Sequence, residues 1–190
     1  MKSLWNCKKW QKRYKDADIT LQPGLKLRFE KGVDPCLRAY CLQFGQWLRR
    51  EYVFPVGITV SVKKAARIRA IDGDLICGSC WKPDCKYKMP YIKIASGDYH
   101  ELLAQRGEVP AIAEILLAIA HELTHYFQWL NGVELTPLGE ERQANRYADL
   151  IVCDYYEAYG GFPKGDGYLA VANSQERDST IISGDGCVCL

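Results

Sequence analysis

The sequence predicts a single α+β domain, and three observations support this fold class. Apolar residues recur at three- and four-residue steps over 110–131, which is the spacing of an amphipathic helix. Apolar and polar residues alternate over 58–63, 67–72 and 91–96, as they do in half-buried strands. With 190 residues, 48% of them hydrophobic, residues 1–190 can form one well-buried core but are too few for two ordinary domains.

Residues 1–20 form a basic N-terminal segment. Its first acidic residue is Asp16, and aromatic residues separate its cations, which are Lys2, Lys8, Lys9, Lys12, Arg13 and Lys15. Such a segment can contact nucleic acid. The pattern favours a solvated helix face whose aromatic side chains turn to the core, so a nucleic-acid partner is not expected.

The next elements follow from capping residues and periodicity. Residues 25–30 alternate well enough for a short strand. Asp34 and Pro35 predict the cap and first turn of an amphipathic helix that extends to Arg50. The alternating runs 58–63 and 67–72 predict a hairpin or meander, and 91–96 predicts one more strand.

Two of the three histidines, His121 and His125, lie one turn apart in the helix expected over 110–131, and Glu122 follows the first. Residues i and i+4 share a helix face, so both imidazoles can bind one metal ion while Glu122 reaches the same cleft. A catalytic zinc has three protein ligands and a water molecule. A third ligand is therefore required.

A second helix is expected downstream, capped by Thr136 and ended by the glycines at 160–161. Glu141, Ala144 and Ala148 share one face of it, and the two alanines allow close packing against the first helix. A glutamate on that face can reach the metal.

The histidine motif followed by Glu141-Arg142-Gln143-Ala144-Asn145 resembles the gluzincin metallopeptidases, the thermolysin-like clan, and above all their compact minigluzincin members. The resemblance covers residues 91–158, which would be the catalytic core. It implies that His121, His125 and Glu141 bind zinc and that Asn145 contacts a ligand histidine, with Asp149 as the substitute.

The resemblance also implies a compact zincin fold and its chemistry. A small mixed sheet would have an edge strand lining the cleft, with the active-site helix and the glutamate helix packed beneath it. Ile94, Ala95 and Ser96 would be that rim and bind an extended peptide or protein substrate, although an ordinary sheet strand is an equal alternative. Glu122 would be the general base of zinc-dependent peptide-bond hydrolysis. The candidates for stabilising the oxyanion are Tyr155, Tyr156 and Tyr159.

Two other interpretations stay open. A catalytically weak or inactive zincin can use its cleft to bind a protein partner, because metal ligands persist in binding modules. Alternatively, His121 and His125 are core histidines of an amphipathic helix, with no metal. Loss of activity in Glu122→Gln with zinc retained would favour the peptidase.

Nine cysteines without a secretory signal argue for reduced thiols or metal ligands. Cys77, Cys80 and Cys85 can hold a second, structural zinc or form a redox disulfide, although ordinary loop thiols are favoured because a fourth ligand is not nearby. His100 is expected at the surface. The apolar runs are too short for a membrane span, so the prediction is a cytoplasmic protein. Residues 160–190 form a glycine-rich tail whose last four residues formally match a prenylation signal.

Overall fold

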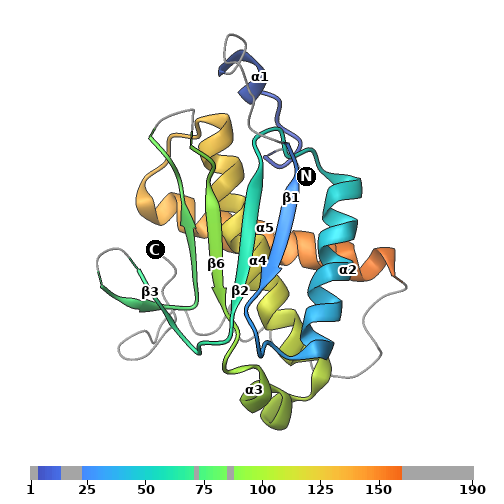
Figure 1. Ribbon diagram of the computed structural model, residues 1–190. Helices are drawn as coiled ribbons and strands as arrows, with labels where there is room; N and C mark the ends of the chain where they lie inside the picture. Colours follow the sequence, from blue (N-terminus) through green and yellow to red (C-terminus); the bar gives the residue numbers. More distant parts are fainter. Residues whose placement is uncertain (1–3, 14–22, 71–72, 85–87, 160–190) are drawn as a thin grey trace.

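The computed structural model describes residues 4–13, 23–70, 73–84 and 88–159. In these residues it confirms the predicted α+β class, with five helices and a small mixed sheet of four strands (Figure 1). Within the same residues, every helix is too short or too polar to cross a bilayer. The predicted C-terminal tail and its prenylation signal lie outside the described residues.

The four-stranded sheet has the order β1-β2-β6-β5. Its first three strands are parallel, and β5 runs antiparallel to β6. Two further strands, β3 and β4, form a separate antiparallel hairpin. The bounds are β1 Leu25–Phe29, β2 Ile58–Lys63, β3 Ile68–Arg69, β4 Leu75–Ile76, β5 Gly78–Trp81 and β6 Tyr91–Ala95.

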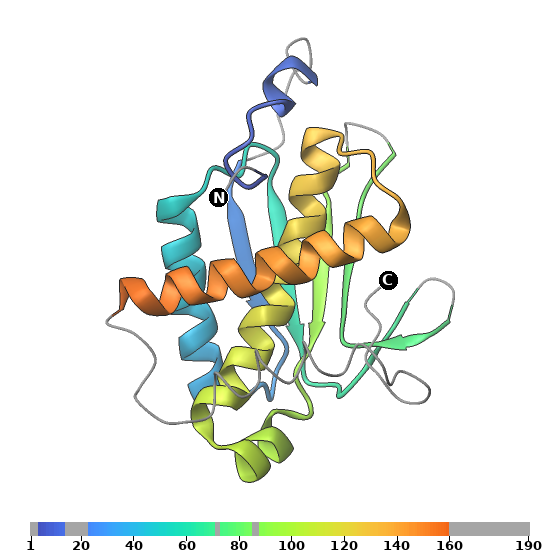
Figure 2. The same cartoon turned by 180° about the vertical axis from the view of Figure 1, so that it is seen from behind.

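The longer helices cover one face of this sheet. Helices α2 and α4 pack against the strands, and Figure 2 shows α5 crossing both on the side away from the sheet. The helices are α1 Trp10–Arg13, α2 Pro35–Glu51, α3 Tyr99–Arg106, α4 Glu108–Asn131 and α5 Pro137–Ala158. The site described below therefore lies on the helical side of the sheet.

Helix ends follow the predicted capping residues. The Asp34 carboxylate accepts hydrogen bonds from the backbone N–H groups of Cys36 and Leu37, and the Thr136 hydroxyl accepts one from Gly139. Helix α4 ends at Asn131 and is capped by Gly132, whose φ of 60° lies in the left-handed region. It begins two residues before Pro110, which is tolerated because the first N–H groups of a helix have no intrahelical acceptor.

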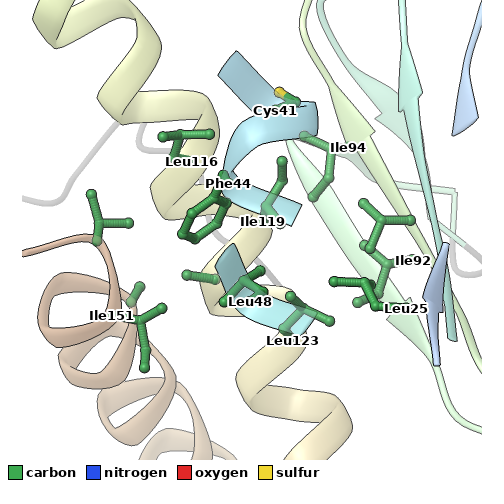
Figure 3. Packing of buried hydrophobic residues seen from close by; sticks show 14 of the residues in the cluster. Leu25, Cys41, Phe44, Leu48, Ile92, Ile94, Leu116, Ile119, Leu123 and Ile151 are labelled. Carbon is green, nitrogen blue, oxygen red and sulfur yellow. The ribbon is translucent and has the colours of Figure 1, made fainter. Parts of the chain in front are cut away.

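The core lies between the sheet and α4. On β2 the side chains of Ile58, Val60 and Val62 are fully buried, while the residues between them are partly exposed. Figure 3 shows side chains of α4 lying between the sheet and α5, among them Leu116, Ile119 and Leu123. Burying each such side chain contributes roughly 1.5–3 kcal/mol, so this layer holds the histidine-bearing helix in place.

The described part of the N-terminal segment, residues 4–13, packs against α4. The Trp5 side chain is 2% exposed, packs on Tyr52 and Phe127, and donates a hydrogen bond from its indole N–H to the Thr124 hydroxyl at 3.1 Å. The expectation that an aromatic side chain of the basic segment turns to the core is confirmed for Trp5. Its bond to Thr124 ties this segment to α4 between the two histidine positions.

Two expectations about the strands are wrong. Strand β2 does not form a hairpin with the run at 67–72, because β2 pairs in parallel with β1 and β6, and Ile68–Arg69 pairs with β4 instead. The predicted rim at Ile94, Ala95 and Ser96 is not an edge, because β6 is paired with β2 on one side and β5 on the other. The N–H of Ala95 donates to Cys77, and that of Ser96 to Lys63.

Candidate metal centre

Helices α4 and α5 bring His121, His125 and Glu141 together. The two imidazole Nε2 atoms are 3.1 Å apart. The Glu141 carboxylate places Oε2 3.3 Å from His121 Nε2 and Oε1 3.1 Å from His125 Nε2. Among the described residues, these three form the one group of at least three His, Cys, Asp or Glu side chains with ligand atoms close enough to hold a metal ion.

The other ring nitrogens of both histidines face amide oxygens. His121 Nδ1 lies 2.9 Å from Asn145 Oδ1, and His125 Nδ1 lies 2.8 Å from Gln128 Oε1. The Gln128 side chain is held in that orientation because its NH₂ group donates to the Glu140 carbonyl at 2.9 Å and to Gln143 Oε1 at 3.1 Å. An oxygen facing Nδ1 favours the tautomer with a proton on Nδ1, which leaves the Nε2 lone pair free.

The two imidazoles and the Glu141 carboxylate therefore meet at a largely buried site. The side chains of His121 and His125 are 7% and 4% exposed, and that of Glu141 is 27% exposed. Burial alone would raise the pKa of Glu141, but without a metal, hydrogen bonds from the two histidines and their positive charge when they are protonated lower its pKa to about 2. A carboxylate and two imidazoles that point lone pairs at one another are a donor set for a cation, so the three residues can hold a metal ion.

Close packing of the helices makes this geometry possible. Ala144 and Ala148 of α5 are 0% and 4% exposed, as expected for small residues at a helix contact. The neighbouring Glu140 is directed elsewhere, since its carboxylate pairs with Lys82 at 3.8 Å. The register of α5 thus offers Glu141, and not Glu140, to the histidines.

Glu122 lies on a different side of α4, against β5. Its side chain is fully buried. A Cβ atom added to Gly78 would lie 2.6 Å from Glu122 Oε1, so the carboxylate fills the space that any other side chain at position 78 would take. Burial, together with the negative charge of Glu122, raises the pKa of the Cys80 thiol, which keeps Cys80 neutral beside the carboxylate.

A cleft of about 340 Å³ opens beside His121. Its walls come from α3, α4, α5 and the end of β6, and both Asn145 and Asp149 line it. Asp149 was predicted as a substitute partner for a histidine, but Asn145 makes that contact and Asp149 lies one turn further along the cleft. Cations also line the cleft, at Arg67 and Arg106.

Several predicted residues are not part of the centre. The three tyrosines begin 14 residues beyond Glu141 on the same helix, which is about 21 Å along its axis. Tyr155 instead packs on Phe44 of α2 and donates to Gln43, which places these oxyanion candidates away from the metal centre. His100 is exposed and pairs with Asp34 at 3.6 Å, as expected of a surface histidine.

The second zinc site is also not formed. Cys77 is disulfide-bonded, which removes its thiolate as a ligand, while Cys80 is a free thiol and Cys85 lies outside the described residues. The disulfide also overturns the expectation of a reduced thiol at Cys77.

Sequence reasoning missed Gln128 and Gly78. Gln128 follows His125 by three residues on the same helix face, so its spacing was a usable signal. Gly78 carried no signal, because its role depends on the pairing of β5 beside α4.

Comparison of the chain with known proteins identifies no relative. No protein-family model matches the chain, and no curated protein or solved structure matches it either. The resemblance to gluzincins therefore stays a prediction, and the function is inferred from the arrangement of residues.

Proposed function

We propose that this protein is a zinc-dependent metallopeptidase of the minigluzincin type. The observation that carries the proposal is the meeting of two imidazole Nε2 atoms and one carboxylate within 3.3 Å of one another, with both imidazoles oriented by amide oxygens. Core histidines without a metal need no such convergence of three lone-pair donors. The position of Glu122 beside the first histidine makes hydrolysis the favoured chemistry.

Zinc is the favoured ion for this donor set. Ligand atoms at zinc–nitrogen distances of roughly 2.0–2.1 Å and tetrahedral angles lie about 3.3–3.4 Å from one another. The separations here are 3.1 to 3.3 Å, so a small ion needs little movement of the side chains. Two imidazoles and one carboxylate are also the ligand set of zinc peptidases that keep a fourth position for water.

In this proposal each residue has a separate task. His121, His125 and Glu141 hold the ion, which when bound acidifies a water molecule and polarises a substrate carbonyl. Glu122 would be the proton acceptor for the attacking water and the proton donor to the leaving amine. Its burial against Gly78 keeps the carboxylate in one orientation.

The substrate would lie between β5 and the cleft. Strand β5 is the last strand of the described sheet, and an extended peptide can add to such an edge through backbone hydrogen bonds. Side chains of the peptide would then enter the cleft beside His121, which is lined by the cations Arg67 and Arg106 and by the acidic residues Glu114 and Asp149. In this proposal the edge strand that binds the substrate is β5 and not the segment at residues 94–96.

The test is hydrolysis of a mixed library of internally quenched peptides by the zinc-loaded protein and by Glu122→Gln. We expect cleavage by the wild type and a loss of about 100-fold or more in the variant, with zinc content unchanged. Equal cleavage by both proteins would overturn the role of Glu122. Zinc binding without cleavage of any peptide by the wild type would favour the protein-binding module.

A further inference from the structure

The face of the sheet turned away from the helices carries an excess of cations. Figure 1 looks onto this face, which α2, α4 and α5 leave open because they lie behind the sheet. Alternation along the strands turns Arg28 of β1, Lys63 of β2 and Lys93 of β6 outward, while the alternate residues within each strand pack toward the core. The β3–β4 hairpin packs at the Ala95 end of this face.

Two aromatic rings stand on the same face. Tyr91 of β6 is directly opposite Trp81 of β5 in the sheet register, and their rings stack at a centroid distance of 5.2 Å and an angle of 18°. The ammonium group of Lys93 lies 5.5 Å from the Tyr91 ring centroid. Tyr91 is 37% exposed, so the ring pair is reachable from solvent.

The register joins these groups into one surface. Arg28 is opposite Ser61, which is opposite Lys93 on the next strand, so cations on β1 and β6 flank a polar row. A groove of about 320 Å³ runs between them and reaches Tyr91. We name this surface the basic sheet face and define it by Arg28, Lys63, Lys93, Tyr91 and Trp81.

The fold does not require the outward-facing charged residues of this sheet to be positive. A half-buried strand requires polar residues on its solvent side, but either sign of charge meets that need. Glu30, the residue directly after β1, is an acidic neighbour of these cations and pairs with Lys63 at 4.0 Å. The cations of the basic sheet face therefore outnumber their acidic neighbour, which makes the face complementary to a polyanion.

We propose that the basic sheet face binds single-stranded nucleic acid, with Arg28, Lys63 and Lys93 on phosphates and a base stacked on Trp81. Cations beside aromatic rings are the combination that such strands recognise, because every base has a face that can stack. An anionic membrane is less well matched, since these rings lie among the cations on a sheet and do not project as an apolar ridge. This site lies on the face of the sheet opposite α4, so it does not depend on the metal centre.

The test is fluorescence anisotropy with a labelled 20-nucleotide oligo(dT) and the matching oligo(U), over a range of salt concentrations. We expect Arg28→Gln with Lys93→Gln to weaken binding of at least one oligonucleotide tenfold or more. The same pair should lower the slope of log affinity against log salt by about 1.4, since each phosphate contact contributes about 0.7 for a single strand. The matched control is Arg142→Gln with Arg146→Gln on the exposed side of α5, which removes the same charge and should change affinity less than about twofold.

The aromatic part is tested separately. We expect Trp81→Ala to weaken binding about fivefold or more and Trp81→Phe to preserve it, because phenylalanine keeps a stacking face. If Trp81→Ala does not fold, Trp81→Leu replaces it. The proposal is overturned if the wild type fails to bind oligonucleotides. It is also overturned if the two double variants, on the basic sheet face and on α5, lose affinity equally, or if Trp81→Ala binds as tightly as the wild type. It is also overturned if Lys8, Lys9 and Lys12 changed to Gln abolish binding, or if vesicles with phosphatidylserine bind and oligonucleotides do not.

Discussion

The two sides of α4 carry different parts of the candidate centre. The side that faces α5 presents His121 and His125 to Glu141, and amide oxygens of Asn145 and Gln128 orient the two rings. The side that faces β5 presents Glu122, which is buried against Gly78. We infer that metal binding depends on the contact between α4 and α5, whereas the orientation of Glu122, the proposed base, depends on the contact between α4 and β5. The two properties should therefore be separable by mutation.

The largest effect is expected on the β5 side of α4, where Gly78→Ala should lower peptide cleavage without loss of zinc. The new methyl group would lie 2.6 Å from the Glu122 carboxylate and displace it. A misplacement of about 1 Å costs on the order of 100-fold in kcat/KM, while zinc content should stay unchanged. Peptide cleavage and metal analysis of the same sample check this, with Ser79→Ala on the same strand as the control. Loss of zinc in Gly78→Ala would show that the two sides are not independent.

A smaller effect is expected at the α5 side, from Gln128→Leu. The variant removes the buried oxygen that faces His125 Nδ1, and such partners of a ligand histidine typically contribute 10- to 100-fold to metal affinity. Titration against a chromophoric chelator measures the change. Gln105→Leu on α3 is the matched control, because it makes the same change at an exposed residue whose amide contacts Glu101 and not a histidine. Equal affinities in Gln128→Leu and the wild type would contradict this support for His125.

The smallest effect is expected from Asn145→Ala. This residue orients His121 in the same way, but it is exposed and lines the cleft, so water can replace its amide oxygen. We expect zinc affinity to fall less than about tenfold. The same chelator titration checks this. If zinc affinity falls more in Asn145→Ala than in Gln128→Leu, the amide that orients His121 contributes more than the one that orients His125, which would contradict this expectation.

The same division describes what the sequence can predict. Both helices of the α4–α5 side could be placed because capping residues and three- or four-residue periodicity are local signals, and spacing alone puts His121 and His125 on one face. Gln128 was available from the same spacing. The α5 tyrosines were candidates only, and the straight helix after Glu141 carries them about 21 Å along its axis away from the centre.

The β5 side could not be predicted in this way. Gly78–Trp81 is short, begins with glycine and shows no alternation of apolar residues, so it reads as part of a cysteine loop. Its place at the edge is set by pairing with β6, which follows it in the chain. Strand order depends on long-range contacts, which is why the rim was assigned to 94–96 in place of β5.

The central claim is that two imidazoles and the carboxylate of Glu141 share one ion. Elemental analysis of zinc in purified wild type, His121→Ala, Glu141→Ala and Glu140→Ala tests it most directly, because Glu140 and Glu141 are neighbours and differ in direction. We predict about one zinc per chain in the wild type and in Glu140→Ala, and a large loss in the other two. Stoichiometric zinc in Glu141→Ala, or its loss in Glu140→Ala alone, would contradict the account.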